Sequence, residues 1–188
     1  MSRLPVLQVF RHLLPRPADG GIKHMQRVAI EAVVQAAGGP LRVVTTHLEY
    51  YSAKQRRAQV AQLRSLQREV ADNEAAPPAA GDTPYDRLPR PVALVLCGDF
   101  NLLPEDEEYR LLFSQEDLVL VDAWRKTHPG KPHPPTTGLY DHKQWKKGGH
   151  CRDYFALTPE LASRIASLTM DEKSDASDHQ ALKLILGD

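Results

Sequence analysis

An unbroken apolar run, Pro91 to Cys97 (PVALVLC), leads directly into Gly98, Asp99, Phe100 and Asn101. A run of this kind and length predicts a strand that is buried on both faces. Along the chain the predicted strands outnumber the predicted helices, and many of them are short and apolar, which suggests an α/β arrangement of sheets with helices outside. The polar residues follow at the carboxyl end of the strand, where the ligand sites of α/β folds tend to form.

The rest of the chain alternates between further apolar patterns and turn signals. Residues 27–37 and 41–47 predict a hairpin, with a turn at Gly38, Gly39 and Pro40. Ser52 and Gln55 match a capping box at the start of a helix over 52–72. Further helices are expected over 104–113 and 159–163, and further strands over 118–124 (strand or turn), 151–158, 164–170 and 180–186.

The length of 188 residues suits a single domain over 1–188, with 73–91 as a surface loop or insertion. No apolar run is long enough to span a membrane, and the first residues lack the centre of a signal peptide, so we expect a cytoplasmic protein. The two cysteines do not suggest a disulfide framework, and Cys97 is expected in the core. Lys plus Arg equals Asp plus Glu, 24 each, which weakens the case for long nucleic acid as the main partner.

Four short polar motifs end or follow apolar segments, and each supplies a carboxylate, an amide or an imidazole. They are Thr45-Thr46-His47-Leu48, Gly98-Asp99-Phe100-Asn101, Arg152-Asp153-Tyr154 and Ser177-Asp178-His179. Hydrolysis of a phosphate ester uses all three kinds of group: oxygen ligands for a divalent cation, a base for the attacking water, and donors to the phosphoryl oxygens. The motifs therefore favour phosphoester hydrolysis.

In this order, and preceded by Ser2-Arg3-Leu4-Pro5, the motifs resemble the endonuclease/exonuclease/phosphatase superfamily, which includes deoxyribonuclease I. The resemblance extends from residue 2 to about residue 186. It implies a two-sheet β-sandwich flanked by helices. It also implies hydrolysis of a phosphodiester or phosphomonoester by in-line attack of an activated water, with Mg²⁺ or Mn²⁺ as cofactor. The substrate stays open, and nucleic acid remains one candidate partner.

The resemblance also implies roles for single residues. Asp99, Asp178 and His179 would bind the metal, and Asp99 would in addition face the phosphate. Asn101 would hydrogen-bond a phosphoryl oxygen from the same side of an extended segment.

The remaining roles implied by the resemblance concern proton transfer. His179 would be the general base or a direct phosphate ligand, and Asp153 would orient its imidazole. His47 would donate to the phosphate or protonate the leaving oxygen.

The chain departs from the superfamily pattern at its beginning. Superfamily members start with a strand that carries an asparagine and continue with a strand that ends in Gln-Glu, whose glutamate is the chief metal ligand. Neither precedes Ser2 here, so we expect an N-terminally incomplete sandwich. A truncation or late start codon, a degraded gene product and completion by another chain compete as explanations, and we favour the first. Missing strands would leave apolar faces uncovered, and we expect poor solubility or weak metal binding.

Other readings of the same residues compete. The incomplete start motivates a non-catalytic binding module that keeps the fold. A His-rich zinc site is the third reading; its histidines have irregular spacing and are His128, His133, His142 and His150. Asp153 could instead pair with Arg152 or Arg125. Several side chains stay open between substrate contact and packing or solvation: Tyr50, Tyr51, Trp145, Lys143, Lys146 and Lys147; Trp124 is expected in the core, and Arg57, Arg64 and Arg68 on a solvated face.

Overall fold

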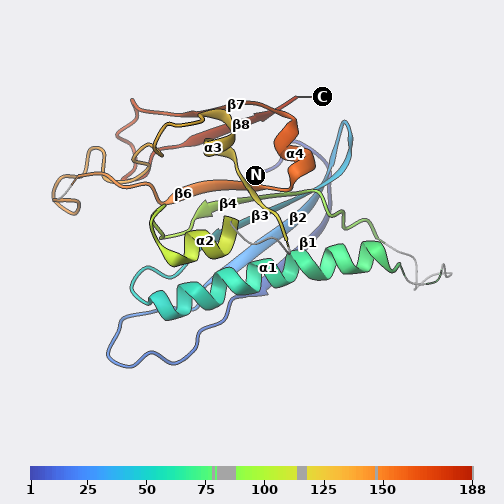
Figure 1. The fold of residues 1–188 in the computed structure, drawn as a ribbon, viewed down its shortest axis with the longest axis horizontal. Coiled ribbons are helices and arrows are strands. Elements are labelled where there is room, and N and C mark those ends of the chain that lie inside the picture. The colour runs from blue at the N-terminus through green and yellow to red at the C-terminus, as the bar shows by residue number, and fades with distance from the viewer. Residues whose placement is uncertain (78, 80–87, 114–117, 147, 188) are drawn as a thin grey trace.

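The computed structural model describes residues 1–77, 79, 88–113, 118–146 and 148–187. Strands and helices alternate along the chain, and strands predominate (Figure 1). The strands are β1 (Val6–Leu13), β2 (Val28–Ala36), β3 (Gly39–His47), β4 (Leu94–Asp99), β5 (Val121–Asp122), β6 (Asp153–Leu157), β7 (Ile165–Met170) and β8 (Leu182–Leu186). The helices are α1 (Ala53–Ala75), α2 (Glu107–Phe113), α3 (Ala123–Thr127) and α4 (Pro159–Ser163).

A six-stranded mixed sheet, in the order β1-β2-β3-β4-β6-β5, forms the centre of the molecule. β1, β2 and β3 are antiparallel, as the expected hairpin requires, and β3 and β4 are parallel. α1 makes the crossover between β3 and β4 and lies with α2 on one face of the sheet (Figure 1). Ser52 begins α1 by accepting a hydrogen bond from the backbone N–H of Gln55.

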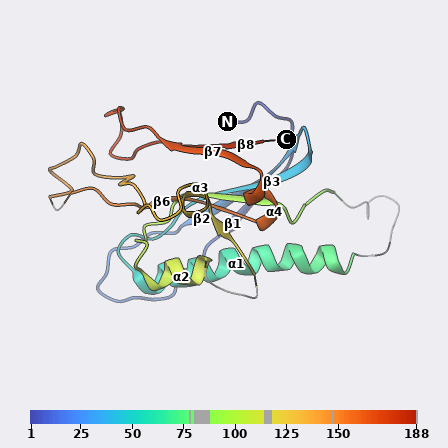
Figure 2. The same ribbon diagram turned by 45° about the horizontal axis from the view of Figure 1, so that its top comes forward.

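The opposite face of the sheet is covered in part by a second sheet, the antiparallel pair β7–β8 (Figure 2). Between the two sheets, Val95 and Leu157 of the large sheet belong to one buried cluster with Leu168 of β7. Leu182 and Leu184 of β8 pack against that cluster. The expected α/β class is therefore confirmed in its coarse form, a six-stranded mixed sheet with a small two-stranded sheet and flanking helices.

The face of α1 that meets the sheet is apolar at the expected spacing. Val60, Leu63 and Val70 are buried there, and Val60 and Leu63 share a core with Leu96 of β4. Arg64 was expected on the solvated face, which is wrong: it is buried, and its guanidinium donates to the carbonyl oxygens of residues 112 and 118. Long cationic side chains can reach backbone acceptors from a buried stem, which a helical pattern alone does not reveal.

A buried ionic cluster lies beneath β2 and β3. The carboxylate of Glu31 is 2.7 Å from Nε of Arg90, 3.6 Å from Nε of Arg42 and 3.0 Å from Nε2 of His12. Burial by itself would raise the pKa of Glu31, but hydrogen bonding to Arg90 and the charge of Arg42 outweigh burial and hold that pKa below its ordinary value of 4.5. Glu31 is therefore an ionised counter-charge inside the fold.

β1 is a strand that the sequence patterns did not predict. It pairs along the edge of the sheet with β2, and its Val9 and Leu13 are largely exposed. Val9 lies in one cross-strand row with Ala32, Val43 and Val95, so it shares the face that β7–β8 covers farther along the sheet. The described structure thus leaves an apolar part of this face open to solvent.

Several predicted boundaries need correction. α1 runs on to Ala75, so residues 73–75 belong to a helix and not to the expected loop. Residues 78 and 80–87 of that loop lie outside the described structure.

Two side chains also differ from expectation. Trp124 lies in α3 and is half-buried, and its indole N–H donates to the carbonyl oxygen of Pro132. Gln55 donates to the carbonyl oxygen of Pro17 and so does not complete a reciprocal capping box.

None of the helices in the described part of the chain is long and apolar enough to cross a membrane.

Leu13 and Leu14 provide a matched pair for testing the open face. Leu13 is 64% exposed and Leu14 is 2% exposed. We expect Leu14→Ala to lower the free energy of unfolding by about 2–5 kcal/mol, and Leu13→Ala to change it by less than about 1 kcal/mol. Leu13→Ala should also reduce binding of a hydrophobic dye to the native protein. Denaturant unfolding and dye fluorescence measure both effects; equal losses of stability would contradict the assignment.

Glu31→Gln should lower the free energy of unfolding at pH 7 by roughly 3–5 kcal/mol, since it leaves Arg42 without its buried counter-charge. The folded-state pKa of Glu31 is lowered, so its contribution is present above about pH 4.5 and disappears as the pH falls through that lower pKa. The two proteins should therefore converge in stability in acid. Glu107→Gln, which breaks the exposed pair with Arg57, is the control and should cost less than about 1 kcal/mol. A pH-independent difference between wild type and Glu31→Gln would refute the account.

Candidate functional site

Strand pairing places three of the predicted residues side by side. His47 pairs in register with Asp99 across β3 and β4, and Asp99 pairs with Asp153 across β4 and β6. Directly paired residues project to the same face of a sheet, so all three side chains lie on the face toward β7–β8. Nε2 of His47 is 3.3 Å from Oδ2 of Asp99.

His179 reaches the same place from the loop that precedes β8. Its Nδ1 is 2.9 Å from Oδ2 of Asp153, and its Nε2 is 3.7 Å from Oδ2 of Asp99. Asp153 therefore pairs with this imidazole, as the sequence predicts, and forms no ion pair with Arg152 or Arg125 in the described structure.

A loop segment that the sequence analysis did not single out fixes this arrangement. The hydroxyl of Thr136 donates to Oδ2 of Asp153 at 2.7 Å, and the carbonyl oxygen of Thr136 accepts from the backbone N–H of Gln180 at 2.7 Å. Gly138 donates from its N–H to the carbonyl oxygen of Asp178 at 3.0 Å. The 136–138 segment thus ties the loop of His179 to the start of β6. The only feature of the sequence that could have pointed to this segment is a pair of threonines after two prolines, in a stretch without periodicity.

The turn after β4 explains why glycine precedes Asp99. Gly98 has φ of 137°, and a Cβ there would lie 1.9 Å from the carbonyl oxygen of Thr46. Asn101 has φ of 49°, so the segment is not extended as expected. Its side-chain amide donates to the carbonyl oxygen of Leu48 at 2.9 Å, and its backbone N–H donates to Asp99 at 2.8 Å. Asn101 is 4% exposed, so its amide is chiefly engaged within the protein.

Burial and pairing shift the three central pKa values in different directions. Burial raises the pKa of Asp99, and the nearby Asp153 adds to that rise. Burial lowers the pKa of His47 despite the attraction of Asp99. The hydrogen bond to Asp153 raises the pKa of His179. The site therefore holds one histidine that keeps its proton poorly and another that gains one readily.

A cavity of about 510 Å³ opens over these groups. Its walls combine the predicted polar residues with an arginine and aromatic side chains that the sequence left open. They are His47, Tyr50, Tyr51, Asp99, Asn101, Gln144, Trp145, Arg152, Asp178 and His179. Carboxylate oxygens, two imidazoles and an arginine are the kinds of group that can bind a phosphate ester and catalyse its hydrolysis.

The described cavity residues include ligands of the type that a divalent cation prefers, but too few of them are grouped to hold the cation. Asp99 and Asp178 offer the carboxylate oxygens that Mg²⁺ and Mn²⁺ prefer, and both line the cavity. In the described part of the chain, however, no three His, Cys, Asp or Glu side chains are grouped so that they could hold a metal ion. The described residues alone therefore do not complete a ligand set.

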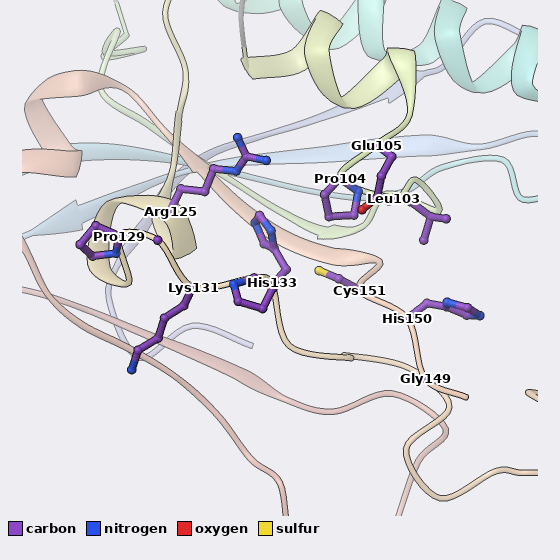
Figure 3. Close-up of a pocket in the computed structure, with 12 residues that line it drawn as sticks. Leu103, Pro104, Glu105, Arg125, Pro129, Lys131, His133, Gly149, His150 and Cys151 are labelled. Carbon is purple, nitrogen blue, oxygen red and sulfur yellow. The ribbon is translucent and has the colours of Figure 1, made fainter. Parts of the chain in front are cut away.

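Two histidines of the Pro-rich loop, His128 and His133, make structural contacts. His133 is hydrogen-bonded to Asp122 at 2.7 Å, and His128 stacks on Trp124 with ring centroids 3.7 Å apart. His133 lines a second cavity of about 830 Å³, into which Cys151 points, whereas His150 points away (Figure 3). The alternative of a His-rich zinc site finds no group of three ligands among the described residues.

Comparison with known proteins finds likeness in structure. No protein-family model and no curated protein sequence matches the chain. An endonuclease/exonuclease/phosphatase from Bacteroides vulgatus superposes with a TM-score of 0.66 at 19% identity, over 97% of this chain and 66% of that one. For a 3'-5' exonuclease from Neisseria meningitidis the TM-score is 0.66 at 21% identity, over 99% and 73%. For a mannosyl-6-phosphatase from Bacteroides thetaiotaomicron it is 0.60 at 15% identity, over 97% and 67%.

We expect Asp153→Asn to lower the pKa of His179, because an amide removes the charge that favours the imidazolium. An NMR pH titration of the imidazole protons, with chelator present, measures this pKa. Asp178→Asn is the control: Asp178 contributes least to the rise, so its removal should lower the pKa less. An unchanged pKa in Asp153→Asn would show that the hydrogen bond does not form.

The chain spans about two thirds of the length of the Bacteroides proteins, so roughly a third of each of them has no counterpart in it. Identities of this size establish the fold and leave the activity open. Over nearly its whole length, the chain has the fold of endonuclease/exonuclease/phosphatase proteins.

Proposed function

We propose that this chain is a phosphoesterase of the endonuclease/exonuclease/phosphatase superfamily. It would hydrolyse a phosphodiester or phosphomonoester by in-line attack of water. The observation that carries the proposal is the contact of 2.9 Å between His179 and Asp153, which holds the imidazole beside Asp99 in the wall of the cavity. A carboxylate that orients an imidazole toward a cavity is the arrangement that general-base catalysis requires.

The contact defines how protons would move. When Nδ1 of His179 donates to Asp153, its Nε2 is the free acceptor, directed toward Asp99 and the cavity. That nitrogen would take a proton from the attacking water as the water oxygen bonds to phosphorus. The P–O bond on the opposite side of the phosphorus breaks, and the departing oxygen must gain a proton. His47, whose Nε2 lies 3.3 Å from Oδ2 of Asp99, would donate it.

The carboxylates define where a cation would act. Asp99 and Asp178 would bind Mg²⁺ or Mn²⁺, with Nε2 of His179 nearby, together with ligands beyond this set. A bound divalent cation at such a site supplies neutralisation of the phosphoryl charge. Phosphodiesters of nucleic acid and phosphomonoesters of sugars are both substrates to test, because an exonuclease and a sugar phosphatase share the fold.

A non-catalytic binding module is the second candidate. It is favoured by the incomplete metal ligand set among the described residues. Such a protein would bind phosphate esters in the same cavity without turning them over.

An assay with an aryl phosphodiester and an aryl phosphomonoester, with Mg²⁺ or Mn²⁺, separates the two candidates. The chain and the longest product encoded by its gene should both be assayed. We expect hydrolysis that chelator abolishes and that His179→Ala lowers about 10²–10⁴-fold in kcat, the usual contribution of a general base. His142→Ala, an exposed histidine outside the cavity, is the control and should be unaffected. Turnover that survives chelator or His179→Ala would exclude this mechanism.

A further inference from the structure

The guanidinium of Arg152 lies against two aromatic rings, those of Tyr50 and Trp145, in the wall of the cavity. Its guanidinium carbon lies 5.0 Å from the ring centroid of Tyr50 and 5.0 Å from that of Trp145. The two rings are 6.4 Å apart at an interplanar angle of 75°. Tyr50 follows β3 and Trp145 comes from the loop before β6, so separate segments fix one cation.

Among the described residues, no carboxylate neutralises the charge of Arg152. Although Asp99 and Asp178 line the same cavity, no carboxylate in the described structure is within ion-pair distance of its guanidinium. Among the described residues, the guanidinium of Arg152 makes one polar contact, from Nη1 to Oδ1 of Asn101 at 3.4 Å. Its Nε is buried without a partner among these residues. A guanidinium has five N–H donors, so most of its capacity is unused.

We propose that Arg152 contacts the substrate and donates to non-bridging oxygens of the phosphoryl group; this inference rests on the function proposed above. A planar guanidinium matches two oxygens of a phosphate at once. Its direction is set beforehand by Tyr50 and Trp145, so little rotational freedom is lost when an oxyanion binds.

The proposal reassigns to Arg152 the donor role that the family resemblance implied for Asn101. The amide nitrogen of Asn101 donates to the carbonyl oxygen of Leu48, and its oxygen faces Arg152. Asn101 is thus a positioning residue for the guanidinium; Arg152 is half-buried, whereas Asn101 is buried. The ligand class is a tetrahedral oxyanion, and inorganic phosphate is its simplest probe.

Arg125 provides a matched control for Arg152. Its guanidinium carbon lies 4.9 Å from the ring centroid of Tyr109, so it makes the same kind of contact, but it does not line the cavity. Inorganic phosphate is titrated with Mg²⁺ present while the fluorescence of Trp145 is followed, in a Trp124→Phe background that removes the other tryptophan. Circular dichroism and the unfolding midpoint establish that each variant is folded.

We expect phosphate to change the emission of the parent and of Arg125→Met with the same Kd. Arg152→Met should raise the Kd at least tenfold. Arg152→Lys should raise the Kd several-fold, since lysine keeps the charge but lacks the paired N–H donors of the planar guanidinium. If Arg152→Met does not fold, the lysine variant carries the test. Phosphate binding within twofold of the parent in the folded Arg152 variants, equal weakening in Arg125→Met, or no binding by the parent would each overturn the proposal.

Hydrolysis assays on the same proteins separate this inference from the proposed function. If the parent binds phosphate through Arg152 but hydrolyses no ester, Arg152 stands as the oxyanion contact of a binding module and the enzymatic proposal fails. If the parent hydrolyses an ester and Arg152→Met keeps its kcat and KM, the enzyme stands and the role of Arg152 fails.

Discussion

The registered pairing of β3, β4 and β6 is the constraint on which the site depends. It sets His47, Asp99 and Asp153 in one row across the sheet. Because side chains alternate between the two faces of a strand, a slip of one residue in either pairing would send one of them to the opposite face. The pairing register of β4 with β3 and β6 therefore determines both which apolar residues enter the core and which polar residues meet in the site.

The two faces of the large sheet have different roles: one buries an ionic cluster, and the other carries the candidate site. One face rests on α1 and carries the buried Glu31 cluster, in which Arg42 and Arg90 neutralise a buried carboxylate. The other face carries the site and packs against β7–β8 over only part of its area. Stability thus comes mainly from the helix side and the inter-sheet cluster. The β1 side of the second face contributes apolar area to solvent.

The sequence predicted what periodicity and capping encode. The hairpin, α1 with Ser52 at its start, the buried strand before Asp99 and the strand that begins at Asp153 all form near their expected bounds. β1 was missed because an edge strand with exposed apolar residues and a bulge near Leu7 lacks the alternation of a half-buried strand.

The sequence predicted those site residues that occur in recognisable motifs. It did not predict the residues that only tertiary contacts bring into the site. The motifs correctly brought His47, Asp99, Asp153 and His179 together, although their roles remain proposals. Nothing in the loop before β6 indicated that it would supply an aromatic wall for Arg152. Loops without periodicity acquire their arrangement from what they pack against, and a single sequence does not contain that information in readable form.

Under the proposed function, four separate segments surround one cation and one phosphate. Titrating the isotope-labelled chain with Mn²⁺ and recording amide NMR spectra tests it most directly, because a paramagnetic ion broadens the resonances nearest to it. The account predicts that the amides of His47, Asp99, Asp153 and His179 broaden first and together. Broadening confined to the loop of His128 and His133, or of Asp99 without His179, would contradict it.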